Sequence, residues 1–332
     1  MKSCQIDPVF VMVIVLNKAA FIVRTNRKST SMPIIAAFVA TMTCIASLPS
    51  AAEVARKGKA TLVRAKGTPD LNKDGEPNLL SHAAMVFDPV SGKALYAKNA
   101  DSAVPIASIT KLMTAMVVLE GRQDLEEPIV IDSADIDTIK NSRSRLPVGT
   151  AFRREDLLRL ALMASDNRAA AALGRAYPGG TTAFVEAMNA KAKLIGLNHT
   201  RFVDSTGLAP SNVASPQDLA LMVAEASRFP QIREYSTTPE LQVTLPNAKR
   251  SIGFNNTNAL VKNAGWDIGL SKTGYINEAG KCLVMHATIA NNPVVIVLLD
   301  SWGKLTRLGD ANRIKKWLET NKQLALIAQK NG

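Results

Sequence analysis

The alternation of apolar and polar positions divides the chain into opening strands, a helical middle and closing strands. Residues 83–87 are apolar, residues 89–92 carry turn residues, and residues 94–97 are apolar again, which predicts a β-hairpin. A longer apolar run over residues 112–119 predicts a buried helix. Apolar residues spaced by three and four predict further helices over 155–163, 168–176 and 181–194.

The second half of the chain changes from helical to strand patterns. Ser215 followed by Pro216 and Asp218 is typical of a helix start, and this helix is expected to end near Arg228. Apolar runs typical of strands then cover residues 241–245, 268–275, 283–289 and 294–299. A last helix is predicted over 311–318. This order predicts an α+β fold: an antiparallel sheet, whose first and last strands meet, flanked by helices and carrying an inserted helical subdomain.

The N-terminal residues 1–52 are typical of an export signal. The apolar segments 9–16 and 33–48 are separated by basic residues, and the small residues 50–52 resemble a signal-peptidase site. We therefore expect cleavage near Ala52, before Glu53, and a periplasmic protein. The alternative is a retained membrane anchor, which needs about 20 consecutive apolar residues, more than either segment offers. No stable membrane anchor is expected after cleavage.

The remaining boundaries follow from composition. Residues 53–80 are polar and without periodicity, which predicts a flexible lead. The domain itself is expected over 81–320, with a tail over 321–332. Hydrophobic residues make up 47% of the 332 residues, enough for a sizeable core.

Charge and cysteine content narrow the function classes. The formal net charge is +12, but the basic residues are scattered and not interleaved with aromatic residues, so nucleic acid is not expected as a partner. An anionic polymer such as the cell wall suits this charge better. Loss of residues 1–52 removes Cys4 and Cys44 and leaves Cys282, which lies in an apolar run and is expected to be a buried small hydrophobe, not a nucleophile.

Ser108 and Lys111 form the first candidate for chemistry. They lie three residues apart at the start of the apolar run 112–119, so a helix would place them on one face. A serine hydroxyl needs a base, and a lysine can act as that base when burial lowers its pKa. The same spacing recurs at Ser301 and Lys304 without an apolar helix behind it, so the spacing alone is weak.

Ser165, Asp166 and Asn167 form the second candidate, between two predicted helices. The Ser165 hydroxyl could relay a proton between Lys111 and a leaving amine, and the Asn167 amide could hold a substrate carbonyl. The alternative is a plain helix cap, because Ser, Asp and Asn are preferred at that position.

Lys272, Thr273 and Gly274 form the third candidate, on the predicted strand 268–275. Lys272 and the Thr273 hydroxyl could meet a substrate carboxylate, while Gly274 could let a substrate backbone pair with the strand edge. The alternative is an exposed lysine and threonine beside a glycine bulge.

The three motifs together, in this order, are shared by class A β-lactamases and penicillin-binding proteins. Residues 83–320 closely resemble the low-molecular-mass penicillin-binding proteins that are serine D-alanyl-D-alanine peptidases, above all their endopeptidase branch. The residues that carry the resemblance lie in segments 105–115, 161–170, 200–208 and 271–282. It implies a β-lactamase/transpeptidase-like fold, with peptidoglycan cross-links as substrate and no cofactor.

The resemblance also implies a role for each motif residue. Ser108 would form an acyl-enzyme with Lys111 as its base, and Ser165 would pass the proton to the leaving amine. Asn167, Lys272, Thr273 and Gly274 would bind substrate, and backbone N–H groups of Ser108 and Tyr275 would form an oxyanion hole. β-Lactam antibiotics would acylate Ser108 covalently.

One departure and several alternatives remain. Ile276 stands where many relatives have Thr. A β-lactamase would place a glutamate after the second motif, but none lies between Glu186 and Glu225. A D-alanyl-D-alanine carboxypeptidase and a non-catalytic cell-wall or penicillin sensor stay open. A metallopeptidase is not expected, since the three histidines lack metal-ligand spacing: His82, His199 and His286.

Overall fold

The computed structural model describes residues 15–16, 19–20, 70–245 and 251–320. In the first part, β1 (Val15–Leu16) pairs antiparallel with β2 (Ala19–Ala20). The rest of the expected export segment, its cleavage site near Ala52 and the expected tail over 321–332 lie outside the described residues. No helix within the described ranges is long and apolar enough to cross a membrane.

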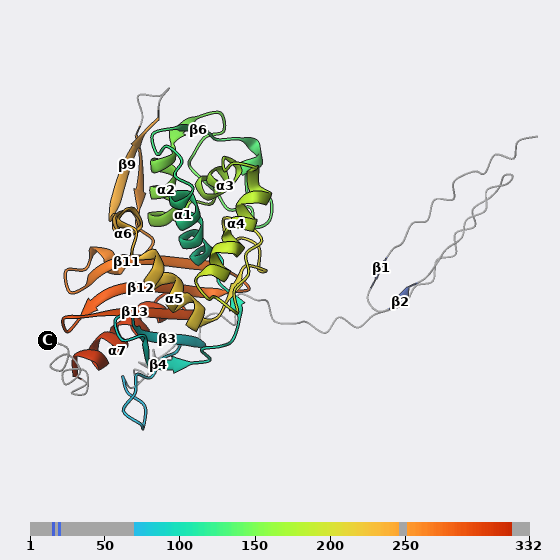
Figure 1. The fold of residues 1–332 in the computed structure, drawn as a ribbon. Coiled ribbons are helices and arrows are strands. Elements are labelled where there is room, and N and C mark those ends of the chain that lie inside the picture. Colours follow the sequence, from blue (N-terminus) through green and yellow to red (C-terminus); the bar gives the residue numbers. More distant parts are fainter. Residues whose placement is uncertain (1–14, 17–18, 21–69, 246–250, 321–332) are drawn as a thin grey trace, which may run out of the picture. The chain divides into compact units, whose positions relative to one another are not determined.

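A five-stranded antiparallel sheet forms the base of the main domain, in the order β11–β12–β13–β3–β4 (Figure 1). Its strands are β3 (Ala83–Asp88), β4 (Lys93–Lys98), β11 (Asp267–Ile276), β12 (Gly280–Ile289) and β13 (Asn292–Ser301). Val297 of β13 lies opposite Met85 of β3. The prediction that the first and last strands meet is therefore confirmed.

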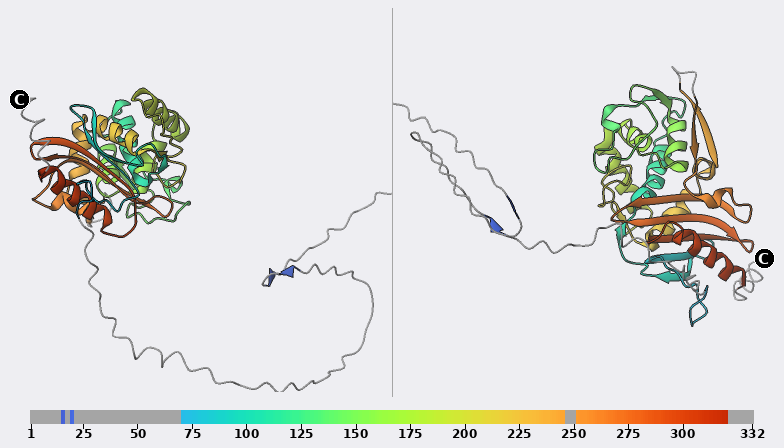
Figure 2. Two further views of the ribbon diagram at one scale, coloured as in Figure 1. Left: turned by 90° about the horizontal axis from the view of Figure 1, so that it is seen from below. Right: turned by 180° about the vertical axis from the view of Figure 1, so that it is seen from behind.

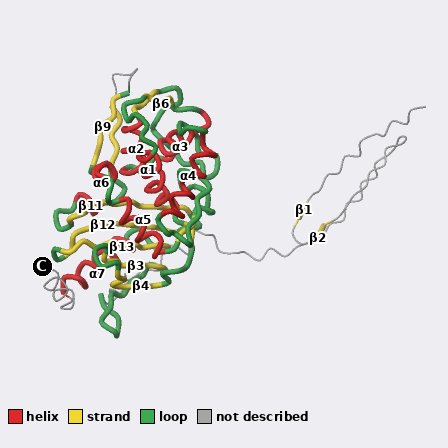
Figure 3. Tube along the Cα trace, in the orientation of Figure 1, coloured by secondary structure: helices red, strands yellow, loops and turns green. Residues whose placement is uncertain are grey.

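The helices between β4 and β11 form the inserted subdomain, which Figure 3 shows as a mostly helical part beside the strands. The helices are α1 (Thr110–Glu120), α2 (Arg154–Met163), α3 (Asn167–Arg175), α4 (Gly180–Leu194), α5 (Pro216–Ala226), α6 (Pro230–Thr237) and, after the sheet, α7 (Thr306–Thr320). Every predicted helix is present. Helix α6 was not expected, because its eight residues are too few for a periodic pattern.

Smaller elements complete the subdomain. Residues 241–245, expected as a strand, correspond to β9 (Glu240–Thr244), which pairs with β10 (Ser251–Asn255) in a separate ribbon. The other short strands are β5 (Val104–Pro105), β6 (Pro128–Val130), β7 (Ala151–Arg153) and β8 (Val213–Ala214). The 3₁₀ turns are η2 (Ala107–Ile109), η3 (Ser133–Asp135) and η4 (Ala259–Lys262).

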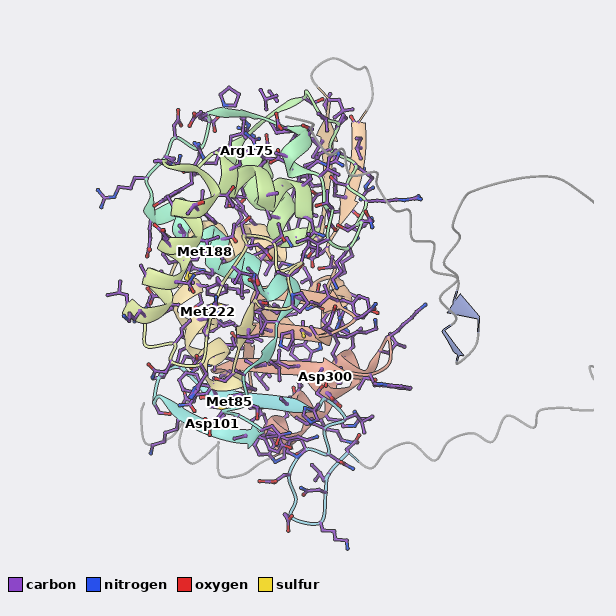
Figure 4. The ribbon with its side chains drawn as sticks, turned by 90° about the vertical axis from the view of Figure 1, so that its right-hand side faces the viewer. Met85, Asp101, Arg175, Met188, Met222 and Asp300 are labelled. Atoms are coloured by element: carbon purple, nitrogen blue, oxygen red, sulfur yellow. The ribbon has the colours of Figure 1, made fainter. Side chains whose placement is uncertain are left out.

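The sheet separates two hydrophobic cores, because successive strand residues point to opposite faces. Met85 and Val297 belong to the core under the helical subdomain, with Met188 and Met222, whose positions Figure 4 marks. Their neighbours in sequence belong to the second core, covered by Ile314, Trp317 and Leu318 of α7. Figure 2 shows α7 on the opposite side of the sheet from α1–α4. The sheet is thus flanked by helices on both faces.

Residues 70–80 correct the extent of the expected flexible lead. Leu79 is buried, and its carbonyl accepts a hydrogen bond from Lys98 Nζ at 2.9 Å. The buried Asp310 carboxylate of α7 accepts from the N–H groups of Leu80 and Ser81 at 3.1 and 2.7 Å. These residues therefore belong to the packed domain, while residues 53–69 lie outside the described part.

Candidate active site

Ser108 lies in the 3₁₀ turn η2, two residues before α1 begins at Thr110. Ala107 has a φ of +48°, in the left-handed region that a residue with a Cβ rarely adopts. The turn is held by Thr110 Oγ1, which donates to the Ala107 carbonyl at 2.8 Å. A non-glycine residue in this conformation is typical of a functional site, where surrounding contacts hold the strain.

Lys111 is fully buried and its Nζ lies 2.8 Å from Ser108 Oγ. Two further oxygens, Asn167 Oδ1 and the Thr206 carbonyl, each lie 2.6 Å from the same nitrogen and accept hydrogen bonds from it. Burial lowers the pKa of Lys111 from 10.5 to about 7, although the carboxylates of Asp204 and Asp166 partly oppose the shift. A large fraction of Lys111 is therefore neutral at pH 7.

The three partners of Lys111 have a direct chemical consequence. A neutral amine has two N–H groups and one lone pair. Asn167 Oδ1 and the Thr206 carbonyl are acceptors only, so they take the two N–H groups. The lone pair is left for the Ser108 hydroxyl, which is the arrangement that removes its proton.

The second motif connects α2 and α3, as the sequence predicts. Asp166 is a helix cap, since its carboxylate accepts from the Ala169 N–H at 2.9 Å. The cap interpretation therefore holds for Asp166, whereas the residues on either side of it face the site. Ser165 has a φ of +57° and its Oγ accepts from Lys272 Nζ at 2.8 Å. Within the described ranges, no hydrogen bond joins Ser165 directly to Lys111.

Asn167 holds Lys111 in the free protein. Its Oδ1 faces Lys111, and its Nδ2 donates to Ser142 Oγ at 2.8 Å. Both ends of the amide are thus occupied by protein groups. Because Nδ2 carries two N–H groups and Ser142 takes one of them, the second N–H can donate to a substrate carbonyl.

The third motif lies on β11, an outer strand of the sheet. Lys272 is buried, with 1% of its surface exposed, so the interpretation as an exposed lysine is wrong. Besides Ser165, its Nζ donates to the Thr273 carbonyl at 2.9 Å. Burial, followed by the nearby charges of Lys111 and Arg307, holds the pKa of Lys272 well below its ordinary value. The Thr273 hydroxyl donates to Thr257 Oγ1 at 2.7 Å.

Gly274 lets β11 pack directly on the Ser108 turn. A Cβ at this position would lie 2.8 Å from the Ile106 carbonyl oxygen and 3.2 Å from the Ser108 nitrogen. Any side chain would therefore push the turn away. The packing of the protein's own backbone therefore requires glycine at this position. This reason adds to the expectation that Gly274 lets a substrate backbone pair with the strand edge.

The loop 204–209 supports the turn from another direction. At Gly207, with a φ of +81°, a Cβ would lie 1.9 Å from the Ala107 carbonyl oxygen. The Asp204 carboxylate accepts from the N–H groups of Thr206, Gly207 and Ala209, at 2.6, 2.6 and 2.9 Å. This hydrogen bonding orients the Thr206 carbonyl toward Lys111. Sequence analysis included this segment only among those that carry the family resemblance, and it predicted no role for it.

Arg307 was missed by sequence analysis. It lies in the first turn of α7, is half-buried, and donates to the Gly274 carbonyl at 3.4 Å. Burial lowers its pKa, and neither an ion pair nor a hydrogen bond to its buried Nε is present within residues 70–245 and 251–320. Arg307 is thus a cation without an anion beside β11. No motif marks it, because it lies 33 residues beyond Gly274 and reaches the site only through the fold.

Cys282 and the histidines take no part in this cluster. Cys282 is fully buried, as expected, and burial raises the pKa of its thiol to about 11. In the described part of the chain, no group of three or more His, Cys, Asp or Glu side chains is placed to hold a metal ion.

Comparison with known proteins agrees with this geometry. The peptidase S11 family model, described as D-alanyl-D-alanine carboxypeptidase, matches residues 71–303. The chain belongs to the peptidase S11 family. It is 46% identical to a D-alanyl-D-alanine endopeptidase of Pseudomonas aeruginosa over 81% of this chain and 87% of the relative. It is 45% identical to a D-alanyl-D-alanine endopeptidase of Escherichia coli over 76% of this chain and 82% of the relative.

The crystal structure of the Streptomyces K15 DD-transpeptidase has the same fold as this S11 member. It matches 73% of this chain and 97% of its own, with a TM-score of 0.67 and 28% sequence identity. The resemblance to serine D-alanyl-D-alanine peptidases and the transpeptidase-like α+β fold are thus confirmed.

Proposed function

We propose that this protein is a serine D-alanyl-D-alanine endopeptidase that hydrolyses peptide cross-links in peptidoglycan through an acyl-enzyme on Ser108. The observation that carries the proposal is the 2.8 Å approach of Lys111 Nζ to Ser108 Oγ, with two acceptors holding its N–H groups. The choice of endopeptidase rests on the two relatives of that name, at 46% and 45% identity. A terminal D-alanine carboxypeptidase is the second candidate, favoured by the description of the family model.

Acylation begins when Ser108 Oγ attacks the carbonyl carbon of a D-alanine residue and its proton moves to Lys111 Nζ. The N–H groups of Ser108 and Tyr275 stabilise the negative oxygen of the tetrahedral intermediate. Lys111 Nζ, now protonated, moves to within hydrogen-bond distance of Ser165 Oγ and passes a proton through that hydroxyl to the leaving nitrogen. The C–N bond then breaks and the amine departs. The Lys272 hydrogen bond to Ser165 Oγ supports this step, because it leaves the Ser165 hydrogen free to point at the leaving group.

Deacylation uses the same groups in reverse. Water attacks the ester carbon, Lys111 takes the proton from the water, and Ser108 Oγ leaves with a proton. A β-lactam such as penicillin follows the acylation step and then stays bound to Ser108, because its leaving group remains attached and hinders the entry of water.

Substrate binding uses the groups around β11. Thr273 and Arg307 bind a substrate carboxylate, for which Arg307 supplies the unpaired charge. Gly274 gives a peptide backbone access to the β11 edge, and the second N–H of Asn167 Nδ2 donates to a substrate carbonyl. Because Lys272 is buried, it contributes through its hydrogen bond to Ser165.

We also propose that residues 1–52 direct export to the periplasm and are removed near Ala52. The basic and apolar pattern of this segment supports the proposal. N-terminal sequencing of the mature protein tests it, since a start at Glu53 is expected, and a retained residue 1 would contradict cleavage.

The activity test compares the chain from Glu53 with its Ser108→Ala variant on a cross-linked muropeptide dimer and on a monomeric pentapeptide. Products are identified by mass. Conversion of the dimer to monomers by the wild type only is the expected result. Loss of one alanine from the pentapeptide with the dimer intact would make the protein a carboxypeptidase. Penicillin binding without turnover of either substrate would make it a sensor.

A further inference from the structure

Loop residues 137–142 reach the catalytic lysine through Asn167. Ser142 Oγ accepts from Asn167 Nδ2 at 2.8 Å, while Asn167 Oδ1 accepts from Lys111. The 137–142 loop is therefore connected to the catalytic centre through Asn167.

A single carboxylate shapes the 137–142 loop. The Asp137 side chain accepts from the N–H groups of Ile139, Lys140 and Ser142, at 2.8, 2.9 and 2.8 Å. These hydrogen bonds hold the pKa of the Asp137 carboxyl below its ordinary value, although burial opposes them. The turn carries the Ser142 hydroxyl toward Asn167, with the Lys140 side chain two residues away.

The Lys140 side chain crosses to the sheet. Its Nζ lies 2.5 Å from Glu278 Oε1, in the turn between β11 and β12, and the two side chains are 28% and 40% exposed. Within residues 70–245 and 251–320, this is the one side-chain hydrogen bond between the 137–142 loop and that turn. The ion pair thus joins the helical subdomain to the end of the strand that carries Gly274.

These contacts form a closed ring around the nucleophile. One side runs from Ser108 through Lys111 and Asn167 to the 137–142 loop. The other side runs from the Ser108 turn across its close contact with Gly274 and along β11 to Glu278. The Lys140–Glu278 pair closes the ring four residues beyond Gly274. A peptide that extends along β11 beyond Gly274 would therefore run toward this ion pair.

We propose that the Lys140–Glu278 ion pair is a positioning brace that sets the space through which the acyl-donor strand of a cross-linked peptide reaches Ser108. The inference rests on the proposed function and deepens it, because the pair selects for long substrates. A small β-lactam needs only the groups beside Ser108 and does not extend to Glu278. The brace therefore affects the two ligands differently.

The test measures kcat/KM for dimer cleavage and the acylation rate constant with penicillin in Lys140→Ala, Glu278→Ala and the charge swap Lys140→Glu/Glu278→Lys. Each single variant is expected to lower dimer cleavage about three- to tenfold, a typical coupling for residues in one network, and to leave penicillin acylation within about twofold. The swap is expected to recover at least about half of the lost rate. Lys316→Ala is the control, because Lys316 also forms an ion pair with a residue distant in sequence, Asp70 at 2.7 Å, but away from the site, and it should change neither rate.

Three results would overturn the brace: single variants that cleave the dimer at wild-type rates, equal losses for dimer and penicillin, or a swap no better than the single variants. The melting temperature of each variant separates these results from unfolding. If the wild type cleaves only the pentapeptide, the endopeptidase proposal fails. The brace is then judged on the pentapeptide, by the kcat/KM of each variant relative to that of the wild type. If the wild type cleaves neither substrate, the brace is judged by the affinity of each variant for the dimer relative to that of the wild type.

Discussion

The pH dependence of Ser108 acylation follows from the burial of Lys111. Burial lowers the pKa of Lys111 from 10.5 to about 7, which corresponds to a free energy on the order of 5 kcal/mol against the charged form. About half of the lysine is then neutral at pH 7, compared with roughly 0.03% for an exposed lysine. Burial thus raises the concentration of the neutral lysine at pH 7 by about three decades.

The assay is the second-order rate constant for acylation by penicillin between pH 5 and 9, followed by intact mass. The rate constant is expected to rise about tenfold per pH unit up to about pH 6, more slowly around pH 7, and to level off above pH 8, as the neutral fraction does. Lys111→Ala should lower the plateau by about two to four decades and remove the inflection near pH 7. A flat wild-type profile, or the same inflection in Lys111→Ala, would refute Lys111 as the base.

The same pKa shift predicts a pH-dependent stability. The folded pKa of Lys111 lies below the unfolded one, so the unfolded chain binds more protons between pH 7 and 10.5, and stability rises with pH through this window. Lys111→Met should lose that part of the rise, measured by urea unfolding at pH 7 and pH 9. An unchanged slope would show that the lysine is not buried in its neutral form.

Three further substitutions test separate parts of the account. Gly274→Ala should slow acylation at least about tenfold, because its Cβ would lie 2.8 Å from the Ile106 carbonyl, and a wild-type rate would contradict this packing. Arg307→Ala should raise KM about tenfold for a substrate with a free carboxylate, and an unchanged KM would remove Arg307 from binding. Asp310→Ala should lower the free energy of unfolding by about 3 kcal/mol, because Ser81 and Arg313 lose a buried partner. A urea midpoint equal to that of the wild type would show that residues 70–81 pack independently of α7.

The fold could be predicted from the sequence where the pattern was long or strongly periodic. Strands β12 and β13 alternate between two cores and were predicted within a few residues, as was the meeting of β13 with β3. Helix α6 and strand β10 were missed, because each is short and partly exposed and therefore shows too little of a periodic pattern. The packing of residues 70–80 could not be predicted either, since it rests on the buried Asp310, which lies about 230 residues away.

The candidate site could be predicted as a set of motifs but not as a geometry. The pairing of Ser108 with Lys111 followed from their spacing, because two residues that are three positions apart at the start of a helix lie on the same face. The burial of Lys272 and its contact with Ser165 depend on how β11 packs against the helical subdomain, which no local pattern encodes. Arg307 was missed for the same reason, because it comes close to Gly274 only when α7 packs on the sheet.

The most direct test of the account is the site of covalent acylation. The chain from Glu53 is incubated with penicillin, digested with trypsin, and the peptide spanning residues 99–111 is sequenced by mass spectrometry. One added penicilloyl group is expected on Ser108, and none in the Ser108→Ala variant. Acylation of another residue, or labelling that survives in Ser108→Ala, would contradict the assignment of Ser108 as the nucleophile.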